Sequence, residues 1–328
     1  MKKKILILGS NSFAGSTFTN YCLKKKIRVD GISRSKISYN FILLNKKQIK
    51  NFDFFKFDLN KDQKRIISLI KKRRYEYIVD FLGQGMVAES WLNPDHWIDT
   101  NVKNKTLLIN KIKNFKFIKK YIRISTPEVY GSYKTKIKEN YNCNPTTPYA
   151  ITHMAIDAML LAFYNTFKFP SIILRFSNFY GPGQQLYRII PQTILKILKK
   201  EKLKLHGSGK SLRSFIYSDD FCKAIFLTIK KGAPGQTYNI SSKEILSISQ
   251  IVKKITKIMK YDYKKLVINV KDRKSKDFKY FMSSDKANKK LKWTNVNKFN
   301  SGLLKTVIWY KDNFNKLKNK NNKYIHKK

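Results

Sequence analysis

The chain has 328 residues, of which 42% are hydrophobic, so it can bury one large core or two smaller ones. Its formal net charge of +48 invites comparison with nucleic-acid-binding and membrane-surface proteins. The lysines are spread along the whole chain, however, with no arginine-rich stripe. This spacing favours a codon bias toward Lys, Asn and Ile as the source of the charge, and we expect no nucleic-acid partner.

The cysteines and the apolar runs indicate in which cellular compartment the protein resides. Cys22, Cys143 and Cys222 lie far apart without a CxxC pair, which argues against a disulfide framework or a zinc knuckle and suits a reducing cytosol. The apolar run Ile5–Leu8 is shorter than the roughly 7–15 residues of a signal-peptide core. No apolar stretch approaches the roughly 18–20 residues of a membrane span. We expect a cytoplasmic protein with no membrane partner and no metal.

Short apolar runs alternate with longer helical patterns over the first 180 residues. The predicted strands are Lys4–Leu8, Ile27–Ile32, Phe52–Phe57, Tyr77–Leu82, Lys120–Ser125 and Ser171–Phe176. Segments with helical spacing lie between them, such as Asp62–Arg74 and Pro94–Ile112. This alternation predicts an α/β fold, a Rossmann-type doubly wound parallel sheet with helices on both faces.

The pattern changes after Tyr180, where Gly and Pro cluster and helices such as Ile189–Lys200 and Ser247–Met259 predominate. We therefore expect a dinucleotide-binding domain over residues 1–180, which also receives strands from about 214–240. A smaller, mixed α/β C-terminal lobe for the substrate is expected over 181–312, interleaved with it. The basic tail over 313–328 is expected to be a solvated or frayed end.

The first predicted strand runs into the loop Gly9–Gly15, which opens a helix through about Lys24. In this context backbone N–H groups and the helix N-terminus hold a pyrophosphate. The spacing resembles GxxGxxG with Ser12 in place of the middle glycine, and the serine hydroxyl could itself donate to phosphate. The predicted cofactor-binding residues of the loop are Gly9, Asn11, Ser12, Phe13 and Gly15. A turn that binds no phosphate is the alternative.

The second predicted strand indicates which dinucleotide binds. An acidic residue at the strand end would favour the ribose hydroxyls of NAD, but Asp30 lies slightly too early for this role. Arg34 and Ser35, which follow the strand, suit the 2′-phosphate of NADP. We predict NAD or NADP as cofactor, with a preference for NADP, and the alternative is that Arg34 is only a surface charge.

Five further motifs follow in the middle of the chain: Ser125–Gly131, Thr147–Ala150, Leu174–Gly183, Arg213–Asp220 and Tyr238–Ile240. In this order they resemble the extended short-chain dehydrogenase/reductases, specifically the NAD(P)-dependent nucleotide-sugar epimerase/dehydratase family, from about Lys4 to Trp293. The resemblance implies an enzyme that binds a nucleotide-sugar and forms a homodimer through helices near 94–112 and 149–164.

The resemblance also implies two sets of binding residues. Cofactor contacts are expected from Asp58, Leu59, Leu82, Gly83, Gln84 and Asn101. Substrate contacts are expected from Gln84, Glu128, Asn178, Arg188, Arg213 and Arg273. Arginine suits a diphosphate because its fork pairs two phosphate oxygens at once. A surface ion pair is the alternative for Arg213 and for Arg273.

Tyr149 is the candidate base that takes the proton of a sugar hydroxyl while hydride leaves for nicotinamide. Thr147 suits an N-cap and Pro148 the first helical position, so we expect Tyr149 at a rigid helix start. The resemblance implies that Thr126 hydrogen-bonds the same sugar hydroxyl and holds it near the nicotinamide.

His153 stands where the family's YxxxK pattern has a lysine, one turn after the tyrosine. That lysine lowers the tyrosine pKa and binds the nicotinamide ribose. Bringing a tyrosine pKa from near 10 to about 7 requires roughly 4 kcal/mol of preferential anion stabilisation. Protonated His153 would supply part of this, and a neutral imidazole would still bond the ribose. We expect His153 to serve catalysis and cofactor binding; a catalytically weakened relative is the alternative.

Glu128 separates the reaction types. Once carbon 4 of the sugar is a ketone, a carboxylate can remove the C5 proton, and loss of the C6 hydroxyl completes a 4,6-dehydration. dTDP-glucose-type dehydratases carry Asp-Glu after the threonine, whereas this chain has Pro127 before Glu128. GDP-mannose dehydratase-like and UDP-glucuronate decarboxylase-like relatives also lack that aspartate but keep the glutamate. We predict a nucleotide-sugar 4,6-dehydratase; a 4-epimerase and a non-catalytic dinucleotide-binding sensor remain alternatives.

Overall fold

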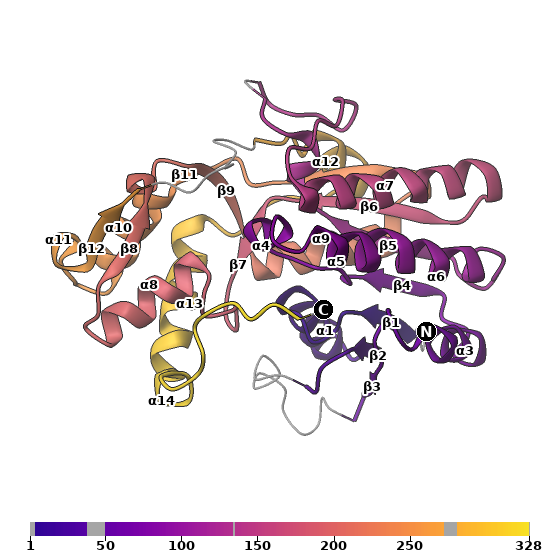
Figure 1. Ribbon diagram of the computed structural model, residues 1–328, viewed down its shortest axis with the longest axis horizontal. Helices are drawn as coiled ribbons and strands as arrows, with labels where there is room; N and C mark the ends of the chain where they lie inside the picture. The colour runs from indigo at the N-terminus through magenta and orange to yellow at the C-terminus, as the bar shows by residue number, and fades with distance from the viewer. Residues whose placement is uncertain (1–3, 38–49, 134, 272–280, 328) are drawn as a thin grey trace.

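The computed structural model describes residues 4–37, 50–133, 135–271 and 281–327. Two lobes lie side by side, a larger one built on a wide sheet and a smaller one formed mainly by later segments (Figure 1). Arg273, a predicted substrate contact, falls outside the described residues. No helix in the described ranges is both long and apolar enough to span a bilayer.

The larger lobe is organised by a seven-stranded parallel sheet with the order β10-β6-β5-β4-β1-β2-β3. Its strands are β1 (Lys4–Leu8), β2 (Arg28–Ser33), β3 (Phe52–Lys56), β4 (Tyr77–Asp80), β5 (Lys120–Ser125), β6 (Ser171–Phe176) and β10 (Thr237–Ile240). The strand order reverses beside β1, and in doubly wound sheets ligands bind at that switch point. The predicted Rossmann-type fold is confirmed.

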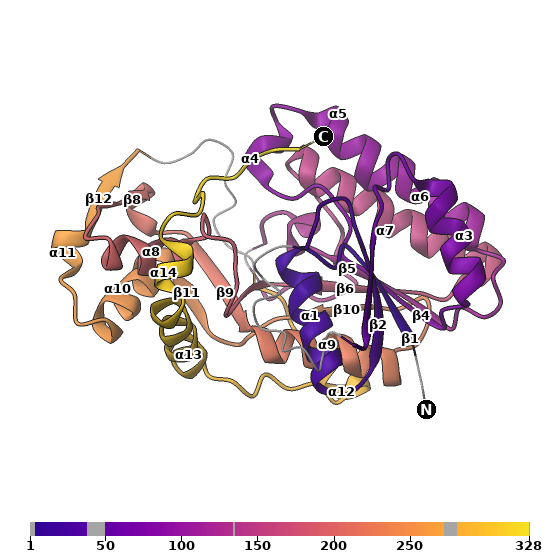
Figure 2. The ribbon, with the colours of Figure 1, turned by 90° about the horizontal axis from the view of Figure 1, so that it is seen from below.

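Helices cover both faces of this sheet (Figure 2). One face carries α1 (Phe13–Lys24), α9 (Ser218–Lys231) and α12 (Asp285–Leu291); the other carries α3 (Gln63–Arg73), α6 (Asn104–Ile112) and α7 (Pro148–Phe167). Side chains alternate along β1, so Ile5 and Ile7 pack under the first set while Leu6 and Leu8 pack under the second. The near-continuous apolar strands follow from burial on both faces.

The predicted helix Pro94–Ile112 is not regular. It consists of α5 (Pro94–Trp97), a π-helical segment η2 (Ile98–Lys103) and α6, preceded by α4 (Val87–Ser90). The wider turn carries Thr100 and Asn101 inward, where both are buried. Single π-helical turns recur at functional sites, and here the turn lies beside the end of β4.

The smaller lobe has its own core. A three-stranded sheet of order β11-β9-β7 joins β7 (Asn178–Tyr180), β9 (Leu212–Tyr217) and β11 (Ile245–Ser247), and β8 (Leu203–His206) pairs with β12 (Val267–Val270). The helices are α8 (Ile189–Leu198), α10 (Ile248–Ile258), α11 (Tyr263–Leu266), α13 (Phe299–Asp312) and α14 (Phe314–Leu317). Their apolar faces meet around buried Ile194, Ile251 and Leu303.

The end of the chain departs from the solvated tail that its composition predicts. After α14, whose Leu317 is buried, the chain returns toward the larger lobe beside α4 and α5 (Figure 2). The His326 ring stacks on Trp97, with ring centroids 5.1 Å apart, and the Lys327 carbonyl accepts a hydrogen bond of 2.7 Å from Gln84 Nε2. A histidine among the lysines thus supplies a ring that can pack, and the tail bridges the two lobes.

Candidate active site

A cavity of about 850 Å³ lies between the two lobes, where the chain leaves the carboxyl ends of the parallel strands. It brings together residues from the phosphate loop, from the turns after β4 and β5, from the start of α7 and from the smaller lobe. The predicted site residues that line it are Ser12, Phe13, Arg34, Leu82, Gly83, Gln84, Thr126, Glu128, Tyr149, His153, Asn178, Arg188 and Arg213.

Other predicted contacts lie outside the lining: Gly9, Asn11, Gly15, Ser35, Asp58, Leu59 and Asn101. Leu59 is buried in the core, and the Asp58 carboxylate accepts from the Asn60 backbone N–H at 2.8 Å. Asn101 Oδ1 accepts from the Gln84 N–H at 2.7 Å. Asn101 therefore fixes the turn after β4 from behind the cavity.

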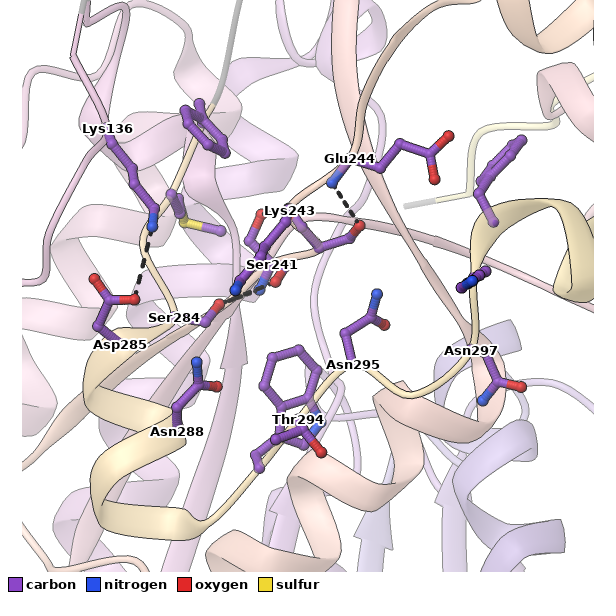
Figure 3. A pocket seen from close by; sticks show the side chains of 16 residues that line it. Lys136, Ser241, Lys243, Glu244, Ser284, Asp285, Asn288, Thr294, Asn295 and Asn297 are labelled. Carbon is purple, nitrogen blue, oxygen red and sulfur yellow. Dashed lines mark hydrogen bonds and ion pairs between the residues drawn. The ribbon is translucent and has the colours of Figure 1, made fainter.

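A second, smaller cavity of about 320 Å³ lies near α12 (Figure 3). Lys136 and Asp285 form an ion pair there at 3.6 Å, and the Ser241 N–H donates to Ser284 Oγ at 2.7 Å. None of the predicted site residues that the structure describes lines this cavity. The candidate chemistry therefore gathers in the larger one.

The phosphate loop is closely packed. Gly9 has a φ of +79°, and a Cβ on Gly15 would lie 2.2 Å from the Gly9 carbonyl oxygen, so both positions require glycine. Ser12 Oγ accepts from the Gly15 N–H at 3.0 Å and donates to the Gly9 carbonyl at 2.7 Å. A hydroxyl has one hydrogen to donate, so Ser12 uses it inside the loop and, contrary to expectation, not toward phosphate.

Residues at the end of β2, near the phosphate loop, are also engaged in contacts within the protein. Asp30 is fully buried, forms an ion pair with Lys4 at 2.8 Å and accepts from the Tyr75 hydroxyl. It therefore cannot serve a ribose in the cavity. Asn11 Nδ2 donates to Ser35 Oγ at 2.9 Å, which ties the two loops together, while Arg34 lines the cavity itself.

Tyr149 lies at the start of α7, as its flanking residues predict. Thr147 Oγ1 accepts from the Ala150 N–H at 3.2 Å and caps the helix, and Pro148 occupies its first turn. Thr126 and Tyr149 both line the cavity, and the Thr126 side chain lies near enough to the phenol to lower its pKa. The two side chains expected to hold one sugar hydroxyl therefore meet at the cavity wall.

The charge around the Tyr149 phenol is mixed. Burial raises the pKa of Tyr149, and the Glu128 carboxylate raises it further. The Thr126 side chain opposes this rise, as do the positive charges of Arg188 and Arg123. A low tyrosine pKa in the working enzyme therefore needs cations at this wall.

His153 cannot supply that charge. It is buried, with its ring centroid 4.4 Å from that of Tyr149, and its Nδ1 lies 3.0 Å from Arg123 Nη2. Burial, followed by the positive charges of Arg123 and Lys105, holds the pKa of His153 well below its usual value. Of the two forms of His153 that the sequence leaves open, this environment favours the neutral imidazole.

Arg123 is one of the cavity residues that the sequence motifs do not mark. It lies in β5, in the otherwise apolar run Tyr121–Ile124, and is 1% exposed. An arginine inside a strand predicted to be buried was the available signal, because a buried charge needs a specific partner. Tyr324 of the tail also lines the cavity, without a motif to mark it.

The sequence pattern of the NAD dependent epimerase/dehydratase family matches residues 5–241. Human dTDP-D-glucose 4,6-dehydratase is 29% identical over 325 residues, which cover 97% of this chain and 92% of the human protein. The crystal structure of dTDP-glucose 4,6-dehydratase from Bacillus anthracis in complex with NAD is 29% identical, with a TM-score of 0.85, covering 95% of this chain and 98% of that one.

An epimerase is also similar, with a lower identity and a comparable TM-score. The structure of UDP-glucose 4-epimerase from Thermotoga maritima with UDP-glucose has 25% identity and a TM-score of 0.87, covering 95% of this chain and 99% of that one. The likeness in each case spans both lobes. As its motifs predict, the chain belongs to the NAD dependent epimerase/dehydratase family.

Proposed function

We propose that the protein is a nucleotide-sugar 4,6-dehydratase. The observation that carries the proposal is the presence of Tyr149, Thr126 and Glu128 on the wall of one cavity. Tyr149 and Thr126 serve any oxidation at carbon 4 of a sugar. Glu128 adds a carboxylate, which dehydration needs and simple 4-epimerisation does not.

The residues present fit an NAD-type dinucleotide. Gly15 leaves the close approach that a phosphate-binding turn requires, and Ser12 and Phe13 at the N-terminus of α1 line the cavity. The N-terminus of α1 at Phe13 would hold the pyrophosphate, with Ser12 shaping the loop, and His153 would hold the nicotinamide ribose. When bound, the nicotinamide accepts hydride from carbon 4 of the sugar and later returns it to carbon 6.

The chain's own residues move the protons. Tyr149, as phenolate, takes the proton of the C4 hydroxyl, which the Thr126 side chain holds in place. The resulting ketone acidifies the C5 proton, which Glu128 removes. Glu128 is the only carboxylate among the described residues that line the cavity, and Pro127 offers no second acid. Glu128 therefore also returns its proton to the departing C6 hydroxyl, which leaves as water. Tyr149 gives up its proton to solvent, and Glu128, protonated again from solvent, supplies a proton to C5 as hydride returns to C6.

A 4-epimerase is the second candidate. It is favoured by Pro127, which stands where dTDP-glucose-type dehydratases carry an acid, and by the likeness to UDP-glucose 4-epimerase. In that reaction the 4-keto sugar turns over in the cavity before hydride returns to carbon 4, and Glu128 has no proton to move. A non-catalytic sensor would bind the dinucleotide without turnover.

The finer assignments belong to the same proposal. NADP is favoured because Asp30 is engaged by Lys4 and Tyr75, while Arg34 lines the cavity. A homodimer is supported by apolar side chains left exposed on the η2, α6 and α7 faces, namely Ile98, Leu107 and Ile151. We place the enzyme in the cytoplasm, in the supply of sugars for polysaccharide synthesis.

The test is a screen of UDP-, GDP-, CDP- and dTDP-hexoses with NAD and with NADP, read by mass spectrometry for loss of water and by proton NMR for epimers. We expect one nucleotide-sugar to yield a product lighter by one water, and Glu128→Gln to abolish that product. An epimer of unchanged mass would support the 4-epimerase instead. Cofactor binding without turnover of any sugar would support the sensor.

A further inference from the structure

Arg123 makes two contacts at the cavity wall. Its Nη1 donates to the Leu82 carbonyl at 3.2 Å, and its Nη2 lies 3.0 Å from His153 Nδ1. Both side chains are buried and both line the cavity. The guanidinium is thus held between the turn after β4 and the first turns of α7.

The contact fixes the state of the imidazole. A guanidinium carries only donors, so His153 Nδ1 must accept the hydrogen bond from Arg123. The ring is then neutral and carries its single hydrogen on Nε2. That atom is buried and has no hydrogen-bond partner among the described residues. A buried polar atom without a partner in a ligand cavity marks a place where a ligand group is expected.

We propose that Arg123 and His153 together replace the single lysine of the YxxxK pattern, with Arg123 as a positioning residue that also supplies the permanent positive charge. This inference rests on the proposed function. The lysine has two tasks, to bond the nicotinamide ribose and to stabilise the tyrosine anion. Here His153 Nε2–H takes the first task, and Arg123 takes the second while holding the imidazole in the required tautomer.

The surrounding charges leave Arg123 available for this role. From α6, Lys105 contacts Asp80 of β4 at 2.8 Å, and from β6, Arg175 contacts Asp157 of α7 at 3.2 Å. No described carboxylate forms an ion pair with Arg123.

Two further residues of the cavity lining act on the charge of the phenol. Arg188 adds positive charge and Glu128 adds negative charge beside Tyr149. Burial and the nearby Arg123 lower the pKa of Lys105 to about 8. As the pH rises, Lys105 therefore loses its charge before Arg123 does. Arg123 keeps its charge throughout, because a guanidinium does not deprotonate in this range.

A lysine at position 153 and the Arg123–His153 pair cannot be present in the same protein. A lysine at position 153 would bring its ammonium against the guanidinium of Arg123, with Lys105 close by. Like charges in a buried site repel strongly. The histidine at 153 is therefore the residue that lets the arginine of β5 take over the charge.

The first test reads the tautomer directly, without turnover. The chain has only 4 histidines, so ¹⁵N NMR of histidine-labelled protein resolves His153, assigned with His153→Gln. We expect a neutral Nε2–H imidazole from pH 5 to 8, and an imidazole that titrates in Arg123→Gln. A His153 that is protonated at pH 7, or that carries its hydrogen on Nδ1, would overturn the proposal.

The second test reads the charge. In Arg123→Gln we expect kcat at pH 7 to fall at least about 10-fold and its pH profile to move at least about one unit to the alkaline side. Arg123→Lys should keep most of the wild-type profile, and Arg123→Gln with His153→Lys should recover activity over Arg123→Gln alone. Arg65→Gln, on the exposed surface of α3, is the matched control.

Two outcomes of the second test would contradict the proposal. One is a pH profile in Arg123→Gln that coincides with that of the wild type. The other is an equal loss in Arg123→Gln and Arg123→Lys with no recovery in the double variant, which would make Arg123 merely structural. If no nucleotide-sugar is turned over at all, the proposed function fails, while the NMR result still decides the state of His153.

Discussion

The phosphate loop and the wall around Tyr149 both depart from their family motifs at one residue, but they accommodate the change differently. In the loop, Ser12 replaces a glycine and its hydroxyl is satisfied by Gly9 and Gly15, three residues away on either side. At the wall, His153 replaces a lysine and its partner is Arg123, on a different element 30 residues earlier. The serine is accommodated by contacts with its neighbours in sequence, whereas the histidine depends on a contact with a distant segment.

The difference follows from what each region contributes. A phosphate loop acts through backbone N–H groups and a helix N-terminus, so a side chain can change if the backbone path is kept. A catalytic tyrosine needs a positive charge nearby, and a lost charge must be replaced by another charge. We therefore expect damage to the loop to appear in cofactor affinity and stability, and damage to the wall in kcat and pH dependence.

The largest effect is expected for Tyr149→Phe. Removal of the phenol takes away the base, and we expect kcat to fall about 1,000-fold or more. Cofactor affinity, measured by equilibrium fluorescence titration, should change less than about three-fold, because the loop is untouched. If the variant keeps more than a tenth of the wild-type kcat, Tyr149 is not the base. The contrast between the phosphate loop and the wall around Tyr149 then fails.

Gly15→Ala should give the opposite pattern. The new Cβ would meet the Gly9 carbonyl at 2.2 Å, so the loop must move away from its phosphate-binding path. We expect the Kd for the dinucleotide to rise at least about 10-fold, while kcat at saturating cofactor stays within about three-fold. Unchanged affinity would show that the pyrophosphate does not lie at this loop.

A smaller effect is expected on stability below neutral pH. His153 has a lowered pKa in the folded state, so below about pH 6.5 the unfolded chain binds a proton that the folded chain does not. The free energy of unfolding should fall by up to about 1.4 kcal/mol per pH unit from this group. Urea titrations at pH 7.5 and 5.5 measure the change.

The matched comparison for the acid effect is His153→Gln. His326 also has a lowered pKa and contributes in the same range, so the absolute slope alone is not diagnostic. The variant should lose less stability between the two pH values than the wild type does. Equal losses in both proteins would mean that His153 is not buried as a neutral group.

The smallest effect is expected for Ser12→Ala. It removes the N-cap of α1 and should cost about 1 kcal/mol of unfolding free energy. Cofactor affinity should change less than about three-fold, because the hydroxyl bonds Gly9 and Gly15 and not phosphate. A larger loss of cofactor affinity with unchanged stability would show that the Ser12 hydroxyl donates to the phosphate.

Much of the larger lobe could be predicted because its signals are local. β1, β5 and β6 have the predicted bounds, since each is a short apolar run buried on both faces. The helix start at Tyr149 was predictable from Thr147 and Pro148, whose capping roles depend only on their neighbours.

The features that were missed depend on contacts between distant segments. The hydrogen bond between Arg123 and His153 joins a strand to a helix, and no sequence period relates the two residues. The tail reads as solvated because lysine and asparagine dominate it, yet His326 stacks on Trp97 more than 200 positions earlier. The π-helical turn was missed because its sequence also suits a regular helix.

The central claim is that Tyr149 and Glu128 act on neighbouring carbons of one sugar, and solvent-deuterium labelling tests it most directly. In D₂O with the accepted nucleotide-sugar, we predict a 4-keto-6-deoxy product that carries one solvent deuterium at C5. Two results would contradict the account. One is a product that has lost no water and has gained deuterium only at exchangeable hydroxyl positions. The other is a product that has lost water but carries no deuterium at C5.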